Sequence, residues 1–193
     1  MKITKWIFIT LLFLVIPISA FALYKPIRVI TPEFFGIHCQ TRILCVEDDT
    51  QFSKAQNLYL KSKNNLETKL GISLSDPRII FCSTEKCKIT FGLSKAAGLS
   101  VGTFGMVIAP RGWNDYYVTH ELIHYWQSQI AGNIKFLFLE KWMTEGMAYS
   151  LSNDPRKTLS EPFQTYRIKF DNWCKSNCSN NLELSFKSKI TWW

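Results

Sequence analysis

Two histidines four positions apart are the residues of this chain best suited to chemistry. They lie in the segment His120-Glu121-Leu122-Ile123-His124, which has the pattern HExxH. Positions i and i+4 lie one turn apart on one face of a helix, so both imidazoles can reach one Zn²⁺ ion. Glu121 can then lie beside the metal without binding it. We predict that Glu121 is the general base, which takes a proton from zinc-bound water and passes it to a leaving amine.

A third metal ligand has to come from elsewhere in the chain. The other histidine, His38, lies far upstream and is expected to be a structural or surface residue. The metzincin pattern would continue with glycine and histidine where this chain has Gln127 and Ile130. A carboxylate is therefore expected. Glu145 stands in an otherwise apolar helix, where a buried charge needs a partner such as zinc, whereas Glu140 stands at the helix start and favours the helix N-terminus.

Two helices must bring these side chains together. The first is expected to begin at Asn114 or Asp115, either of which can cap it, and to run to about Ile130. Its face opposite the histidines is apolar and can be buried in a core. The second is expected over residues 140–151 and carries Glu145.

The remaining elements are expected from shorter patterns. Residues 26–47 hold short apolar stretches that predict extended chain or a strand, and residues 50–70 have the apolar spacing of a helix. A last helix is expected over residues 162–173, and residues 182–193 give no clear pattern. No internal linker is evident, so residues 23–193 are predicted to form one α+β domain. Strands are expected at residues 78–82, 88–91 and 104–109.

The two helical segments together resemble the gluzincin metallopeptidases, especially their aminopeptidase N-like branch. In that family an HExxH helix is followed by a second helix with a Trp-x-x-Glu-Gly-type signature, which here is Trp142-Met-Thr-Glu145-Gly146. The resemblance covers about residues 117–152. It implies four site residues: the zinc ligands His120, His124 and Glu145, and the general base Glu121.

The resemblance also implies a fold and a mode of substrate binding. It implies a small zincin-like domain in which a mixed sheet of few strands carries the HExxH helix. It further implies an antiparallel edge strand to which peptide substrate adds as another strand, and residues 104–109 lie at the right place in the chain for it. The family's Gly-x-Met-Glu-Asn segment is missing, so endopeptidase and exopeptidase action both remain open. Tyr149 and Tyr166 are candidates for the transition-state donor.

The first 22 residues have the layout of a secretory signal peptide. Two lysines precede an apolar run, and Ala20-Phe-Ala22 offers a cleavage site for residues 1–22. An uncleaved N-terminal membrane anchor is the alternative, and both predict export.

Six cysteines, all beyond the signal segment, fit an oxidising compartment. They fall into couples close in sequence, and short loops close with the least loss of entropy. We expect local disulfides, with Cys82–Cys87 closing a hairpin between two strands. The three expected pairs are Cys39–Cys45, Cys82–Cys87 and Cys174–Cys178.

Composition sets limits on function. A chain of 193 residues with 47% hydrophobic and 20% charged residues is typical of a globular protein, which excludes wholesale disorder. The net charge is +8, but the basic residues are scattered, so no nucleic acid is expected as a partner, while association with a membrane or cell envelope stays open. The predicted function is an exported zinc-dependent peptidase acting on peptides or proteins. The alternative is an exported, disulfide-stapled binding or inhibitor module with a coincidental HExxH motif.

Overall fold

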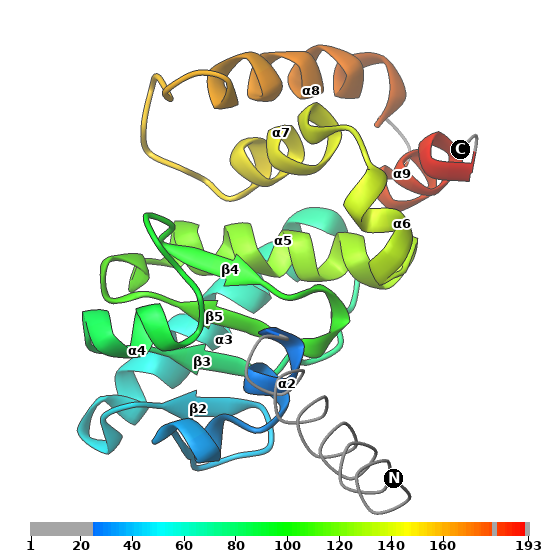
Figure 1. Cartoon of the computed structure of the whole chain (residues 1–193). Coiled ribbons are helices and arrows are strands. Elements are labelled where there is room, and N and C mark those ends of the chain that lie inside the picture. Colours follow the sequence, from blue (N-terminus) through cyan, green and yellow to red (C-terminus); the bar gives the residue numbers. More distant parts are fainter. Residues whose placement is uncertain (1–24, 179–180, 192–193) are drawn as a thin grey trace, which may run out of the picture.

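The structure is a computed structural model, and it describes residues 25–178 and 181–191 (Figure 1). The expected signal segment lies outside the described residues. Within them, a small mixed sheet and a set of helices form an α+β fold, as predicted. The helices are α2 (Lys25–Ile30), α3 (Phe52–Leu70), α4 (Glu85–Thr90), α5 (Asp115–Ala131), α6 (Asn133–Phe138), α7 (Lys141–Leu151), α8 (Phe163–Asn177) and α9 (Leu182–Thr191).

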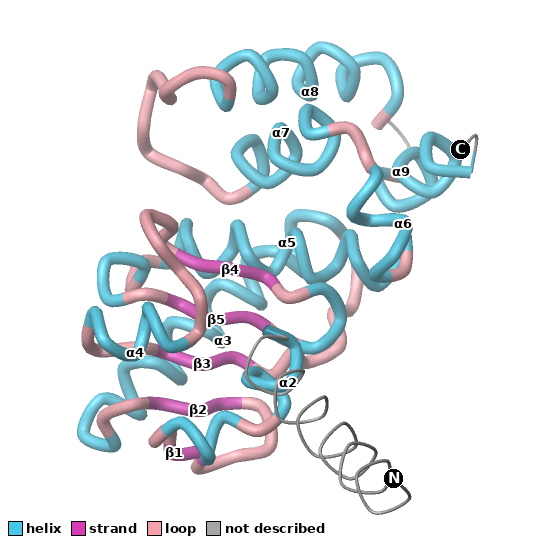
Figure 2. Tube along the Cα trace, in the orientation of Figure 1, coloured by secondary structure: helices cyan, strands magenta, loops and turns pink. Residues whose placement is uncertain are grey.

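The sheet of the described residues has the strand order β1-β2-β3-β5-β4 (Figure 2). Its three central strands β2, β3 and β5 are parallel, whereas the outer strands β1 and β4 run antiparallel to their neighbours. The strands are β1 (His38–Cys39), β2 (Leu44–Val46), β3 (Ile79–Phe81), β4 (Gly98–Ser100) and β5 (Met106–Ile108).

The central strands are buried on both faces, which explains their continuous apolar sequences. On one face, Ile79 and Phe81 of β3 pack into a core with α3, α5 and α7. On the other face, Ile80 packs with Val29 of α2 and Cys87 of α4. Figure 1 shows a further layer, in which α7 and α8 lie above α5. The HExxH helix α5 is therefore held between the sheet and this helical layer.

Two expectations about secondary structure are wrong. Residues 88–91 do not form a strand, because the Thr84 side chain accepts a hydrogen bond from the Cys87 backbone N–H and starts helix α4. Residues 25–30 are helical rather than extended. As a helix, this short apolar run packs on the sheet and buries Val29 there.

All three local disulfides are present, so the expected pairing is confirmed. Cys82–Cys87 does not close a hairpin, however: it joins the end of β3 to α4. Three disulfides indicate an oxidising environment. No helix in the described part of the chain is long and apolar enough to cross a membrane.

Candidate metal centre

Helix α5 carries the HExxH motif across the middle of the molecule. It begins directly after Asn114 and stops directly before Gly132, whose φ of 77° is in the left-handed region. Val118 and Leu122 are fully buried on the side of the sheet. This burial fixes the rotation of the helix, so that His120 and His124 face the helical layer and the cleft.

Helix α7 supplies the third side chain, Glu145. The next residue, Gly146, lies against α8: a Cβ atom there would stand 2.3 Å from the backbone oxygen of Tyr166. A side chain at this position would therefore push the two helices apart. The glycine of the Glu145-Gly146 pair lets α8 support α7 directly behind the carboxylate.

The three side chains form a triangle of ligand atoms. His120 Nε2 and His124 Nε2 are 3.1 Å apart, and Glu145 Oε2 lies 3.5 Å from the first and 3.6 Å from the second. Ligand atoms about 2.0–2.1 Å from a tetrahedral zinc ion are themselves about 3.3–3.4 Å apart. The cluster therefore has the donor set and the spacing to hold a metal ion.

The electrostatics of the cluster also favour a cation. Burial alone would raise the pKa of the Glu145 carboxyl, but hydrogen bonds and charge from the two histidines outweigh it and lower that pKa. Burial alone would lower the pKa of His124, but its charged and hydrogen-bonding neighbours, chiefly Glu145, outweigh the burial and raise that pKa. Two imidazole nitrogens that face each other at 3.1 Å need a proton or a cation between them, since their lone pairs otherwise repel.

A buried glutamine orients one of the histidines. Gln127 is fully buried, and its Nε2 donates to the backbone oxygen of Thr144 at 3.2 Å. Its Oε1 therefore faces Nδ1 of His124 at 2.9 Å and accepts a hydrogen bond from it. This places the proton of neutral His124 on Nδ1 and leaves Nε2 free to bind a metal. From the sequence, Gln127 only excluded the metzincin pattern, and this orienting role was not expected.

Glu121 lies beside the cluster but is not one of its members. Its carboxylate accepts a hydrogen bond from the backbone of Ser100, and burial raises its pKa. The absence of a side chain at Gly98 leaves room for Glu121, because a Cβ at Gly98 would stand 2.6 Å from Glu121 Cγ. Strand β4 thus holds the expected general base in place through its backbone.

The site opens into a cleft of about 560 Å³. One wall is β4 with the loop before it, the floor is α5, and the other wall is α7 with Arg156 and Phe163. His120, Glu121, His124 and Glu145 all line the cleft. A ligand in the cleft can therefore reach the metal position and the base together.

Of the other residues that the sequence suggested for the site, one lines the cleft and two do not belong to the site. Tyr149 lines the cleft, its ring centroid lies 4.5 Å from that of His120, and burial raises its pKa to about 12. Tyr166 does not line the cleft and packs against Phe163. Glu140 is also outside the cluster: its carboxylate accepts a hydrogen bond from the indole N–H of Trp142 at 2.6 Å.

His38 lies away from the cluster, exposed and paired with Asp49 at 2.7 Å. Tyr117 and Arg156 are among the cleft residues that were not expected from the sequence. Tyr117 stands three positions before His120 on α5, so helix periodicity already puts it on the same face. Arg156 comes from a loop, and no sequence pattern indicated it.

Comparison with protein-family models, with curated proteins and with solved structures gave no significant match. The case for a function therefore depends on the geometry of the site.

Proposed function

We propose that this protein is a metal-dependent hydrolase of the zincin-like class. Within that class, we propose an exported zinc peptidase of the gluzincin type. The observation that carries the proposal is the triangle of His120, His124 and Glu145, with a buried carboxylate, Glu121, beside it in the same cleft. Three protein ligands with room for a fourth is the arrangement of catalytic rather than structural zinc sites.

Each residue of the site has a defined part in this proposal. The two histidines and Glu145 would hold the metal. Bound zinc supplies Lewis acidity, which polarises a carbonyl and lowers the pKa of water. Glu121 is placed to take a proton in the cleft and return it to the leaving amine. Tyr149, whose ring contacts that of His120, is the better candidate for a hydrogen-bond donor to the transition state.

The edge strand of the sheet supports a peptide as the substrate. Residues 104–109 were expected to form this edge strand, but β5, which lies there, is inside the sheet between β3 and β4. The edge strand beside the HExxH helix is β4, which pairs with β5 and lines the cleft. An extended peptide can add to its outer edge and run past Glu121.

Metal analysis of the purified, oxidised protein tests the proposal. We expect one zinc per chain and cleavage of an unbiased peptide mixture. His120→Ala should lose the zinc and the activity. His38→Ala is the matched control, since it removes a histidine outside the cluster and should keep both. Folded, oxidised protein that takes up no metal would leave the alternative of a binding or inhibitor module.

A further inference from the structure

The cleft carries positive charge beyond the groups that would perform catalysis. Apart from Glu121 and Glu145, its charged lining residues are all basic: Lys95, Arg111, Lys141 and Arg156. Lys95, Arg111 and Lys141 are exposed, and none has an acidic partner within 4 Å among the described residues. Bound zinc would offset the two carboxylates, so the cleft would remain cationic.

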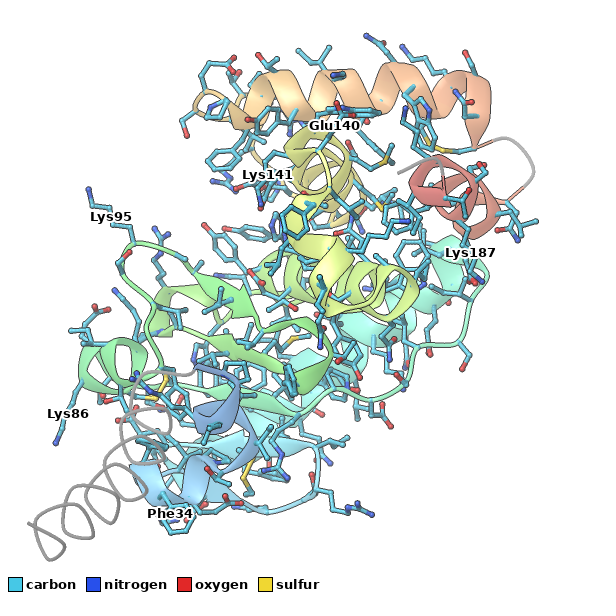
Figure 3. The ribbon with its side chains drawn as sticks, turned by 45° about the vertical axis from the view of Figure 1, so that its right-hand side comes forward. Phe34, Lys86, Lys95, Glu140, Lys141 and Lys187 are labelled. Carbon is cyan, nitrogen blue, oxygen red and sulfur yellow. A yellow bond between two sulfur atoms is a disulfide. The ribbon has the colours of Figure 1, made fainter. Side chains whose placement is uncertain are left out.

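These charges lie on both walls of the cleft. Lys95 is in the loop before β4, and Arg111 is in the short helix η4 (Pro110–Gly112), where it donates a hydrogen bond to the backbone oxygen of Lys95. Lys141 is the first residue of α7 on the opposite wall. Figure 3 shows Lys95 on the loop before β4 and Lys141 on the helical layer above it. A peptide lying along β4 would pass between them.

Arg156 is the fixed member of the set. Its Nε is 2.8 Å and 3.0 Å from the two carboxylate oxygens of Asp154, whose side chain is only 2% exposed, and its Nη2 donates to the same carboxylate. Its guanidinium also lies 5.7 Å and 5.8 Å from the ring centroids of Tyr117 and Tyr149. Among the described residues Nη1 has no partner. Because the side chain is already held in place, an incoming carboxylate can bind Nη1 with little loss of side-chain entropy.

We propose that the cleft selects acidic peptides. This rests on the proposed peptidase function and names its substrate class. Arg156 binds a substrate carboxylate, while Lys95, Arg111 and Lys141 attract acidic chains and disfavour basic ones. The carboxylate can belong to an Asp or Glu side chain or to the C-terminus of the substrate, and the peptides used in the test distinguish the two.

Calorimetric titration of Glu121→Gln with short synthetic peptides tests the selection without turnover. Each acidic peptide is paired with its Asn/Gln counterpart, and each is made with a free and an amidated C-terminus. We expect acidic peptides to bind at least ~10-fold more tightly than their neutral counterparts, and less so at high salt. Weaker binding of the amidated form than of the free form of the same peptide would assign the carboxylate to the C-terminus. Tighter binding of an amidated acidic peptide than of its amidated Asn/Gln counterpart would assign it to side chains.

Two double variants distinguish the effect of charges in the cleft from the effect of the net charge of the protein. Lys95→Glu/Lys141→Glu should reduce the preference to within ~3-fold of unity. Lys86→Glu/Lys187→Glu changes the net charge equally at exposed positions outside the cleft and should leave the preference unchanged (Figure 3). Arg156→Gln should weaken the binding of peptides that carry a carboxylate, while neutral peptides with an amidated C-terminus should bind as before.

The proposal would be overturned if neither acidic side chains nor a free C-terminus improved binding, or if the two double variants had equal effects. The titrations are run on zinc-loaded and on metal-free protein. The four basic side chains belong to the chain itself, so they can select acidic peptides whether or not zinc is bound. Protein that takes up no zinc but still prefers acidic peptides would refute the proposed peptidase function and support the selection of acidic peptides. Protein that binds zinc and cleaves all peptides equally would support the peptidase function and refute the selection.

Discussion

Two carboxylates of the site have different surroundings, and their substitutions should differ accordingly. Glu145 is paired with both histidines, whereas Glu121 is held by the backbone of β4. Glu121→Gln should keep stoichiometric zinc and lower kcat by roughly 10²–10⁴-fold, because it removes only the proton acceptor. Glu145→Ala should lower zinc affinity, and excess zinc should restore part of the activity. Zinc content and turnover are measured on both; the reverse pattern would exchange the two roles.

Gln127 should raise the zinc affinity without binding the metal itself. Gln127→Met keeps the size of the side chain but cannot accept the hydrogen bond from His124 Nδ1. We expect a zinc affinity lower by roughly 10–100-fold, measured by competition with a chelator. Gln129→Ala is the matched control, because Gln129 is exposed and bonds Ser75 instead. Unchanged affinity in a folded Gln127→Met protein would show that His124 needs no such support.

At the scale of elements, the contact between α7 and α8 fixes the third ligand. Gly146→Ala places a Cβ against the backbone oxygen of Tyr166, so the helices must separate. We expect a loss of about 1–3 kcal/mol in the free energy of unfolding, as for other overpacked sites. Zinc affinity should fall with it, because Glu145 moves with α7. Chemical denaturation and chelator competition measure the two effects, and wild-type values for both would refute this packing argument.

The link between α3 and the loop after it should make stability depend on pH. Lys63 and Tyr59 of α3 both donate to Asp76 and lower its pKa below the ordinary value of 3.8. The bonded carboxylate therefore contributes stability above that value, and the contribution is lost as the pH falls through the lowered pKa. Asp76→Asn should be less stable than wild type at neutral pH, and the difference should shrink in acid. Denaturation midpoints across this range measure it; a constant difference would contradict the coupling.

Strong local signals made some of the fold and the site predictable from the sequence. The expected helix over 50–70 and the HExxH helix appear within a few residues of their expected bounds, because apolar periodicity and the glycines that follow them, Gly71 and Gly132, act locally; the expected side-chain cap at Asn114 does not form. Glu145 was expected because a buried charge in an apolar helix needs a partner. Strand β4 was missed because three residues, one of them Gly98, show no alternation. Arg156 was missed because it stands in a loop without periodicity, where the neighbouring Asp154 and tyrosine rings from α5 and α7 position it.

At the scale of the whole molecule, the proposed metal ligands come from two different layers. His120 and His124 belong to α5 on the sheet, and Glu145 belongs to the helical layer above it (Figure 1). A metal bound there would tie the layers together, and binding to the folded state alone raises stability by mass action. We expect chelation to lower the Tm and to speed trypsin cleavage at Arg156 and Lys157, which are exposed in the connection between α7 and α8. Identical cleavage with and without zinc would contradict this.

Such a tie would couple the lifetime of the protein to the supply of its metal. Outside the cell the chain would meet proteases, and molecules that had lost their ion would open at the connection between α7 and α8 and be degraded first. Surviving molecules would then be the loaded ones. Zinc scarcity would lower the amount of the protein as well as its activity, so the zinc concentration around the protein would set how fast the protein is degraded.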